Sequence, residues 1–413
     1  MGNEKPTGAL RTGEILLPNE KVDLAKWAVV ACDQFTAQPE YWREVEAIVS
    51  DAPSALRVTL PEVWLDEAQN RIPAIHATMR QYLADGVLRT AVQEGFVLVE
   101  RQTGAGVRPG LLACLDLECY DFTPGARSLI RPTEGTVVSR VPPRAAIRRG
   151  APLELPHVLM LIDDPGNTVI EPLLAQRDRL RKLYDFELMQ GGGHLRGWAV
   201  EGAVARGVLD AVDALNAQSD GLLFAVGDGN HSLAAAKQCW MELREGLSDA
   251  QRQTHPARWA MVELNNLCSP ALRFEPIHRV LYDVDAAALI EEYRNYLRAS
   301  GADEGAGDDL IAFDGAHTWR FRSARHPLRL LQAFLDAYLA RHPEVRIDYI
   351  HGADALRDIV SRGNAMGFMP RAFDKAELFD YIRQYGVLPR KTFSMGEANE
   401  KRYYLEARRI QPE

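Results

Sequence analysis

The sequence has no long apolar run. None of the hydrophobic stretches in its 413 residues approaches the ~20 residues that a membrane-spanning helix needs. The first residues, MGNEKPTGALRTGE, also lack the apolar segment of a secretory signal peptide. We therefore expect a soluble, cytoplasmic chain with no membrane partner.

Cysteines are few, and their spacing forms no pair. The five are Cys32, Cys114, Cys119, Cys239 and Cys268. An odd number without a C-x-x-C spacing argues against a disulfide framework and against a structural zinc site. We expect free thiols in a reducing compartment.

An excess of basic residues is also absent. The 48 Lys and Arg residues are outnumbered by 57 Asp and Glu residues, which gives a formal net charge of -9. Binding to a phosphate backbone needs a concentration of Lys and Arg, whereas acidic residues are interleaved with them here. The sequence therefore predicts no nucleic-acid partner.

Several common catalytic signatures are missing. The sequence contains no H-E-x-x-H zinc motif, no G-x-S-x-G elbow, no S-x-x-K tetrad and no EF-hand loop. The phosphate-binding P-loop, G-x-x-x-x-G-K-[ST], is absent as well. Hydrolases of the common serine and zinc types therefore have no support.

What is present is enough apolar content for a sizeable core. Hydrophobic residues make up 46% and charged residues 25% of the chain, which is typical of globular proteins. Strand-like runs alternate with helix-like ones, which favours a mixed α/β (α+β) fold. A composition shift near 280–305 ends in a Gly/Asp-rich stretch. We expect a larger domain over 1–283 and a smaller α/β domain over 284–413.

Four segments carry more specific expectations. Residues 27–35 (WAVVACDQF) are typical of an apolar strand, and residues 171–188 of a charged amphipathic helix. Residues 124–152 are rich in Pro, Gly and Arg and show no periodicity. Long stretches of this kind inside a domain are often functional, so we expect an ordered functional loop there. Residues 191–198 (GGGHLRGW) are expected to form a glycine-rich connection.

The strongest local feature is LLFAVGDGNHSLAAAK, at residues 222–237. A short apolar strand runs into a turn that contains Gly227 and Gly229, and an Ala-rich helix begins at about Ser232. Glycines let the backbone turn sharply and approach a ligand closely. The first N–H groups of a helix and its dipole favour an anion. The pattern therefore predicts a phosphate cradle.

Two titratable side chains stand in this turn. Asp228 is a candidate Mg²⁺ ligand or proton acceptor, and His231 is a candidate phosphate contact or proton carrier. The structural alternative is that Asp228 or Asn230 only caps the helix. The turn nearly matches the dinucleotide fingerprint, with Ser232 at the last glycine, but no acidic strand end follows ~20 residues later. A nicotinamide or flavin site is therefore disfavoured.

Other candidate site residues lie outside the turn. The segment 191–197 is a candidate backbone anion nest with His194 and Arg196 beside it, and a flexible loop is the alternative. Glu263 alternates with apolar residues at a strand end, where ligands often sit. Arg279 is a candidate for the same cleft, although such a residue is more often structural.

Several segments, in the same order, resemble one family. They are CDQFTAQPEYWREVE, TEGT, GAPLELPHVLMLIDDP, LYDFELMQGGGHLRG, GDGNHS, FEPIHRVL and VLPRKTF. On these segments the chain is identified as a member of the bacterial and archaeal family called domain of unknown function 1015. The resemblance covers nearly the whole chain.

The turn itself resembles the Asp-Gly-His-His-Arg signature of the ParB/sulfiredoxin-like superfamily. Members of that superfamily, among them a free serine kinase, sulfiredoxin and CTP-binding ParB proteins, bind nucleotides with this strand, turn and helix. The resemblance implies a nucleotide phosphate site in which Asp228, Gly229 and His231 match the signature. Asn230 replaces the first His, and Ser232 replaces the Arg that is expected to hold phosphate.

A serine cannot supply the charge of the missing arginine. Either another cation takes its place, with Arg196, Lys237 and Arg279 as candidates, or nucleotide binding has been lost or changed. The resemblance thus leaves two functional hypotheses open, and they differ in whether the bound ligand is consumed.

The first hypothesis is a nucleotide-dependent phosphotransferase that acts on a small hydroxyl-bearing metabolite and uses ATP or ADP with Mg²⁺. Phosphoryl transfer needs positioning and charge neutralisation. Asp228 would serve as base or metal ligand, His231 as phosphate contact and Glu263 as second carboxylate. The alternative is a non-catalytic regulatory protein that binds a nucleotide or another anion. A DNA-associated role of the ParB kind is disfavoured by the net charge of -9. A homodimer is the oligomeric state considered from the sequence.

Overall fold

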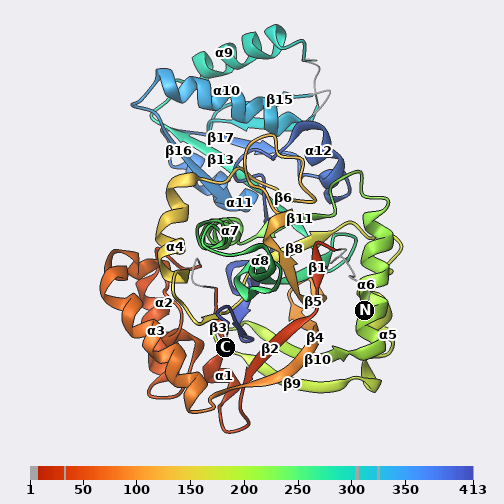
Figure 1. Cartoon of the computed structure of the whole chain (residues 1–413). Coiled ribbons are helices and arrows are strands. Elements are labelled where there is room, and N and C mark those ends of the chain that lie inside the picture. The colour runs from red at the N-terminus through yellow and green to blue at the C-terminus, as the bar shows by residue number, and fades with distance from the viewer. Residues whose placement is uncertain (1–7, 32–33, 303–306, 323–325, 413) are drawn as a thin grey trace. The chain divides into compact units, whose positions relative to one another are not determined.

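The computed structural model describes residues 8–31, 34–302, 307–322 and 326–412. The chain divides into two compact units that both mix helices and strands (Figure 1). Unit 1 comprises the chain up to Leu272 together with the segment from Gly396 onward, and unit 2 comprises Arg273–Met395. This division differs from the predicted boundary at 283/284, because residues 274–282 pair with strands of unit 2 and the C-terminal segment returns to unit 1.

Unit 1 is built on a ten-stranded sheet. Its strands are β1 Leu10–Arg11, β2 Gly13–Pro18, β4 Leu88–Thr103, β5 Gly106–Asp116, β6 Ile130–Pro132, β8 Leu159–Ile162, β9 Arg181–Leu188, β10 Gly193–Glu201, β11 Phe224–Asp228 and β12 Trp259–Asn266. The order is β6-β11-β8-β12-β5-β4-β10-β9, with β1 beside β5 and β2 beside β4. The pairs β6–β11 and β8–β12 are parallel, and the other described pairs of this sheet are antiparallel.

Helices cover both faces of this sheet. They are α1 Leu24–Trp27, α2 Pro39–Val49, α3 Ala68–Ala84, α4 Val141–Arg148, α5 Glu171–Ala175, α6 Gly202–Asn216, α7 Asn230–Arg244 and α8 Asp249–Thr254. Helices α2 and α3 lie on one side of the strands, and α5 and α6 on the other (Figure 1). Alternate residues of β4 serve the two cores: Val97 shares a cluster with Met79 of α3, and Leu98 shares one with Val208 of α6.

The C-terminal segment is part of the core of unit 1. Strand β19 (Tyr403–Tyr404) pairs with β3 (Val29–Val30), and β20 (Arg408–Arg409) pairs with β7 (Leu153–Glu154). Leu405, between the two strands, is 0% exposed. The segment therefore covers one sheet face with buried side chains, and its polar residues are brought close to the sheet.

Unit 2 is a smaller sheet with helices packed on it. Its strands are β13 Phe274–Tyr282, β14 Leu310–Phe313, β15 Thr318–Phe321, β16 Arg346–His351, β17 Ala365–Pro370 and β18 Phe393–Met395, and its helices are α9 Ala286–Ala299, α10 Pro327–Arg341, α11 Ala353–Ser361 and α12 Leu378–Tyr385. The strand order is β15-β14-β17-β13-β16, with β18 beside β13. Tyr293 and Phe334 pack between α9 and α10, with ring centroids 5.0 Å apart.

Several local predictions are wrong. The predicted strand 27–35 is the end of α1 followed by the short β3, and residues 32–33 lie outside the described residues. Residues 171–188 form α5 and then β9, not one helix. The charged residues of β9 face β10, where Asp185 lies opposite Arg196 and Glu187 opposite His194. A strand pair thus accounts for charges that resemble a helical surface.

The segment 124–152 is less irregular than predicted. It contains β6 and the helix α4, which begins at Val141 and has proline in its first turn. Proline is tolerated there because the first helical N–H groups have no partner within the helix. Only residues 191–192 of the glycine-rich segment 191–198 belong to a turn, and residues 193–198 are part of β10.

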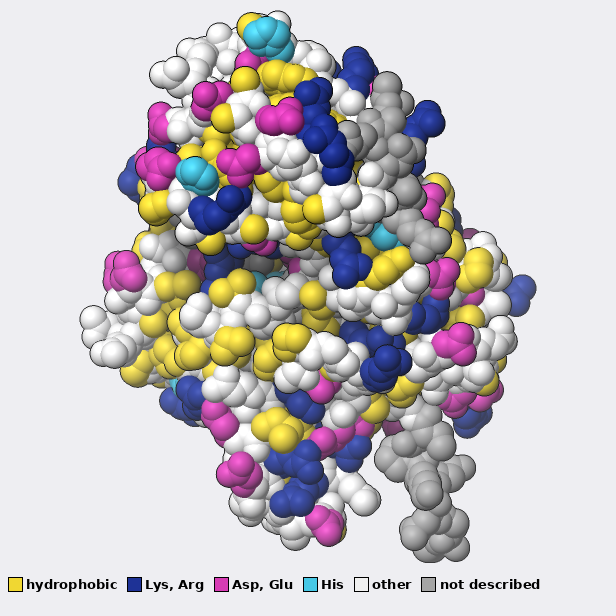
Figure 2. Space-filling model, turned by 90° about the horizontal axis from the view of Figure 1, so that it is seen from above, with side chains coloured by type: hydrophobic (Ala, Val, Ile, Leu, Met, Phe, Trp, Pro, Cys, Tyr) yellow, Lys and Arg dark blue, Asp and Glu magenta, His cyan; other side chains and the backbone are white. Residues whose placement is uncertain are grey.

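The structure also describes four of the cysteines, the lengths of the helices and the charges on one face. Cys114, Cys119, Cys239 and Cys268 are free thiols, and Cys32 lies outside the described residues. No helix in the described ranges combines the length and the apolarity needed to cross a bilayer. On the face drawn in Figure 2, basic and acidic side chains are interspersed.

Candidate functional site

The predicted strand, turn and helix are present in unit 1, where the strand, β11, lies between β6 and β8. Strand β11 ends at Asp228, and α7 begins at Asn230. Gly229 between them has φ +79° in the left-handed region, which L side chains rarely adopt. A Cβ on this residue would also lie 3.0 Å from Cα of Val158. Glycine is therefore required both by the turn and by the close approach of the next strand.

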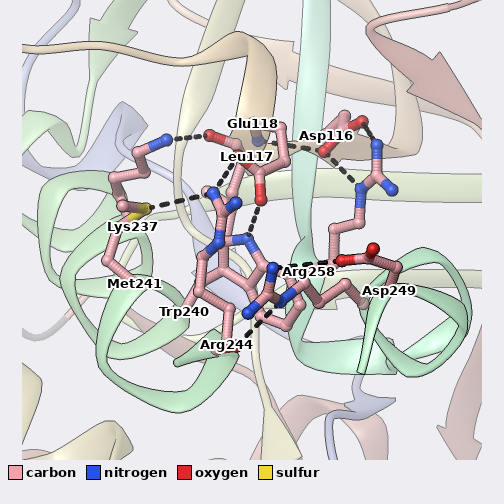
Figure 3. Close-up of polar contacts among 10 residues, drawn as sticks. Asp116, Leu117, Glu118, Lys237, Trp240, Met241, Arg244, Asp249 and Arg258 are labelled. Carbon is pink, nitrogen blue, oxygen red and sulfur yellow. Dashed lines mark hydrogen bonds and ion pairs between the residues drawn. The ribbon is translucent and has the colours of Figure 1, made fainter. Parts of the chain in front are cut away.

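Helix α7 is held in place by polar contacts along its C-terminal half (Figure 3). The side-chain N–H groups of Trp240 and Arg244 donate to the two carboxylate oxygens of Glu118, at 2.7 and 2.6 Å. Lys237 Nζ donates to the carbonyl of Leu117 at 2.8 Å, and burial lowers the pKa of Lys237. These contacts hold the second half of α7 against the segment 117–118, and they engage Lys237 there rather than at the turn.

The carboxylate of Asp228 has a cation beside it. Lys401 Nζ lies 3.1 Å from Oδ2, and the backbone N–H of Gly229 donates to Oδ1 at 2.9 Å. Burial acts to raise the pKa of Asp228, but Lys401, the N–H of Gly229 and His157 outweigh it, so the pKa is lowered. Asp228 is thus a carboxylate in a partly buried ion pair at the start of a helix.

Ser232 belongs to a chain of hydrogen bonds. Its hydroxyl lies 2.9 Å from Nε2 of His157, and Nδ1 of the same ring lies 3.0 Å from the hydroxyl of Tyr404. If Nδ1 carries the proton and donates to Tyr404, Nε2 accepts from Ser232; the other tautomer reverses both directions. Ser232 therefore contacts a histidine that is oriented from both sides.

Asn230 and His231 attach the segment 133–137 to the turn. The side-chain amide of Asn230 donates to the carbonyl of Glu134 at 3.0 Å, and the hydroxyl of Tyr120 donates to Asn230 Oδ1 at 3.2 Å. His231 Nε2 accepts from the backbone N–H of Val137 at 3.2 Å. Part of the predicted functional loop therefore adjoins the turn, and His231 is engaged in holding it.

Glu263 lies near the turn but inside the protein. In the sheet register, both Glu263 and Asp228 are partners of Leu159 on the strand between them, so their Cα atoms are about two strand spacings, or ~10 Å, apart. Glu263 is 1% exposed and pairs with Arg402, which also pairs with Glu406. Burial acts to raise the pKa of Glu263, but Arg402 and its neighbours lower it.

One short segment reaches all of these groups. Within four residues, Lys401 pairs with Asp228, Arg402 with Glu263, and Tyr404 with His157. No local pattern in the sequence predicted these pairs, because the last two join residues 139 and 247 positions apart. The run Lys-Arg-Tyr-Tyr at 401–404 and the histidine before β8 were the visible signals, and neither has a diagnostic spacing.

The remaining predicted site residues, His194, Arg196 and Arg279, have other partners. His194 bonds to Asp185 and Glu187 across β9, and Arg196 lies 3.3 Å from Asp185. Arg279 lies in unit 2, where its guanidinium donates to Gln332 and to the carbonyls of Ile277 and Arg390. Within the described residues of unit 1, Lys401 is the cation that forms an ion pair with Asp228.

The glycine-rich turn does have an indirect link to this segment. The carbonyl of Gly192 accepts from Arg101 Nε at 2.8 Å, and Arg101 Nη1 donates to the carbonyl of Lys401 at 3.1 Å. Gly192 therefore helps to hold the backbone that carries Lys401, through a buried guanidinium whose pKa burial lowers to about 10.

The described residues contain no group of three or more His, Cys, Asp or Glu side chains that could hold a metal ion alone. Mg²⁺ often needs only one or two carboxylates when substrate phosphates and water complete its shell. Asp228 fits that requirement, since its carboxylate stands at the start of α7. The donor set is thus compatible with Mg²⁺ that arrives with a nucleotide.

Comparisons with known proteins give one family and several distant structures. The model of a family described as protein of unknown function (DUF1015) matches residues 15–408, and no curated protein matches the chain. Similar solved structures include a free serine kinase in complex with AMP, which is 11% identical over 73% of this chain and 91% of that chain, with a TM-score of 0.39.

Two further structures are similarly distant. A conserved hypothetical protein from Pyrococcus furiosus is 11% identical over 73% of this chain and 95% of that chain, with a TM-score of 0.36. SbnI with a C-terminal truncation, from Staphylococcus aureus, is 8% identical over 68% of this chain and 81% of that chain, with a TM-score of 0.37. Likeness at this level assigns no function.

Proposed function

The chain belongs to the family described as protein of unknown function (DUF1015), and we propose that it binds a nucleotide by its phosphates at the turn 227–232. The observation that carries this proposal is the pair of Asp228 and Lys401 at the start of α7. It brings an ammonium group and a carboxylate to the first N–H groups of a 15-residue helix. Those groups serve to bind phosphate and its Mg²⁺ in proteins.

In this proposal Lys401 takes the part of the arginine that Ser232 replaces. An ammonium group binds phosphate as a point charge, without the bidentate geometry of guanidinium. Asp228, Gly229 and His231 then correspond to the matching residues of the ParB/sulfiredoxin-like signature. Lys401 would exchange its contact with Asp228 for one with phosphate, which frees the carboxylate for the metal.

We further propose that the chain is a phosphotransferase that acts on a small hydroxyl-bearing metabolite. The hydroxyl oxygen bonds to the γ-phosphorus of ATP, the bond to the bridging oxygen breaks, and ADP leaves. The hydroxyl proton passes to the imidazole of His157, which contacts Ser232. Mg²⁺ held by Asp228 and the phosphates would neutralise the charge that develops.

Isothermal titration tests the binding step. The protein is titrated with ATP, ADP, CTP and GTP, each with Mg²⁺, beside Lys401→Gln and a control, Lys21→Gln, at an exposed lysine. Hydrogen bonds to charged groups contribute ~1.5–3 kcal/mol, so Lys401→Gln should weaken nucleotide binding at least about tenfold. Lys21→Gln should bind as the unaltered chain does. If no nucleotide binds, or if both variants bind equally, the site is wrong.

Turnover separates the enzyme from the regulatory protein. With ATP and a panel of hydroxyl-bearing metabolites, we expect ATP consumption that Asp228→Asn reduces about 100-fold or more, since metal-dependent charge neutralisation is lost. Binding of ATP with no consumption would instead support a non-catalytic protein that uses the nucleotide as a signal.

A further inference from the structure

A cavity of about 160 Å³ lies in unit 1 beside the turn. Its walls come from the segment 58–65, α3, α4, the segment 151–158, α7, β12 and β19, and they include His157, Ser232 and Tyr404. A Cβ on Gly229 would lie 3.4 Å from the ring of His157. The cavity and the proposed phosphate site therefore share the wall formed by His157 and Ser232.

The charged groups of the cavity wall are already paired with one another. Arg144 forms an ion pair with Glu62, and Arg148 lies 2.5 Å from Glu154. A charged ligand in this cavity would lose its hydration without gaining an unpaired counter-ion. The wall therefore favours an uncharged ligand.

Most of the remaining wall is apolar. Leu60, Met79, Ile147, Leu233 and Met261 are among the residues that line it. A cavity of ~150 Å³ in another protein takes up benzene, whereas sites for drug-sized ligands measure ~300–1,000 Å³. At about 160 Å³, the cavity is too small for a nucleotide and suits a molecule with roughly the bulk of a six-membered ring.

From this geometry we propose that the cavity binds a small, uncharged, mainly apolar alcohol, with its hydroxyl group on Ser232 and His157. This proposal rests on the proposed function, because it assigns the class of the molecule that accepts the phosphoryl group. Ser232 and His157 are the polar side chains of the wall that also reach the turn. An alcohol held there presents its oxygen toward the bound phosphates.

Isothermal titration with cyclopentanol, without nucleotide, tests the proposal, and L-serine serves as a charged probe of similar size. We expect cyclopentanol to bind and L-serine not to bind. Ser232→Ala should weaken cyclopentanol binding about tenfold, the loss of one hydrogen bond. Ala235→Leu should fill part of the cavity and abolish binding, whereas Ala214→Leu at an exposed position of α6 should not.

The outcomes separate this proposal from the function on which it rests. If ADP binds but cyclopentanol does not, or if L-serine binds instead, the alcohol cavity is refuted and the nucleotide site stands. If cyclopentanol binds and no nucleotide does, the cavity stands and the phosphotransferase fails. Should Ala235→Leu not fold, Ser232→Ala decides, because unchanged affinity in that variant would refute the placement of the hydroxyl.

Discussion

Replacing Arg402 with methionine should destabilise the C-terminal segment that carries Lys401 and Tyr404 to the site. Arg402 is 3% exposed and pairs with Glu263 and Glu406, which are 1% and 0% exposed. Methionine fills a similar volume but removes the cation that is paired directly with both carboxylates. Breaking a buried ion pair in this way costs about 3–5 kcal/mol. Arg402→Met should therefore lower the free energy of unfolding by at least ~3 kcal/mol at pH 7.5.

The pH dependence of this loss has a definite sign. In the unaltered chain, burial acts to raise the pKa of Glu263, but the charges of Arg402, Arg108 and Arg101 outweigh burial, so the pKa is lowered. The stability that Glu263 contributes is therefore present above the ordinary pKa of about 4.3 and is lost as the pH falls through the lower folded value. Without Arg402, the largest of the influences that lower the pKa of Glu263 is lost, so that pKa should be higher in the variant. The deficit of Arg402→Met should then shrink between pH 7.5 and pH 5.

Urea unfolding followed by tryptophan fluorescence measures the effect. The control is Arg43→Met, because Arg43 pairs with Glu40 on the surface and both side chains are 69% exposed. That exposed pair should contribute no more than ~0.5 kcal/mol. Adding Glu263→Gln and Glu406→Gln to Arg402→Met should recover part of the loss. If Arg402→Met is no less stable than Arg43→Met, the buried network does not hold the segment.

Three further perturbations probe the turn, the helix behind it and a surface cluster. Gly229→Ala should destabilise the chain by about 1–2 kcal/mol, because the residue has positive φ and lies against Val158, next to β8. The control is Gly207→Ala inside α6, where a Cβ meets nothing within 4 Å, and it should be neutral or stabilising by up to ~1 kcal/mol. Equal effects of the two substitutions in thermal unfolding would contradict the turn geometry. Glu118→Gln should lower the free energy of unfolding by about 1 kcal/mol, because one of the two hydrogen bonds from α7 to Glu118 loses its charged acceptor. An unchanged melting temperature would contradict the role of Glu118 in holding α7. The hydrogen bond to Asp185 raises the pKa of His194, so its contribution to stability is present below about pH 6.5 and lost as the pH rises through the folded pKa; an NMR titration that gives a pKa at or below 6.5 would refute this pairing.

Local sequence signals predicted the turn because its causes are local. The apolar run that forms β11, the glycine with positive φ and the Ala-rich start of α7 lie within a few consecutive residues. Both elements are shifted by about two residues from the prediction: β11 continues to Asp228, and the helix begins at Asn230.

Contacts between residues far apart in the sequence could not be predicted from local patterns. Lys401 and Arg402 fall within the predicted C-terminal domain, 284–413, yet they contact Asp228 and Glu263 in unit 1. No periodicity encodes such a contact. The prediction of a helix over 171–188 was wrong for a similar reason. Opposite charges three or four residues apart are typical of a helix surface, whereas the charged residues of β9 lie opposite charged residues of β10.

A crystal structure of the protein soaked with ADP and Mg²⁺ tests the central claim most directly. We predict density for the phosphates within hydrogen-bonding distance of the first N–H groups of α7 and of Lys401 Nζ, with the contact between Lys401 and Asp228 opened. Phosphate density at another place in the chain, or an unaltered pair of Lys401 and Asp228 beside an empty turn at saturating ADP, would contradict the account.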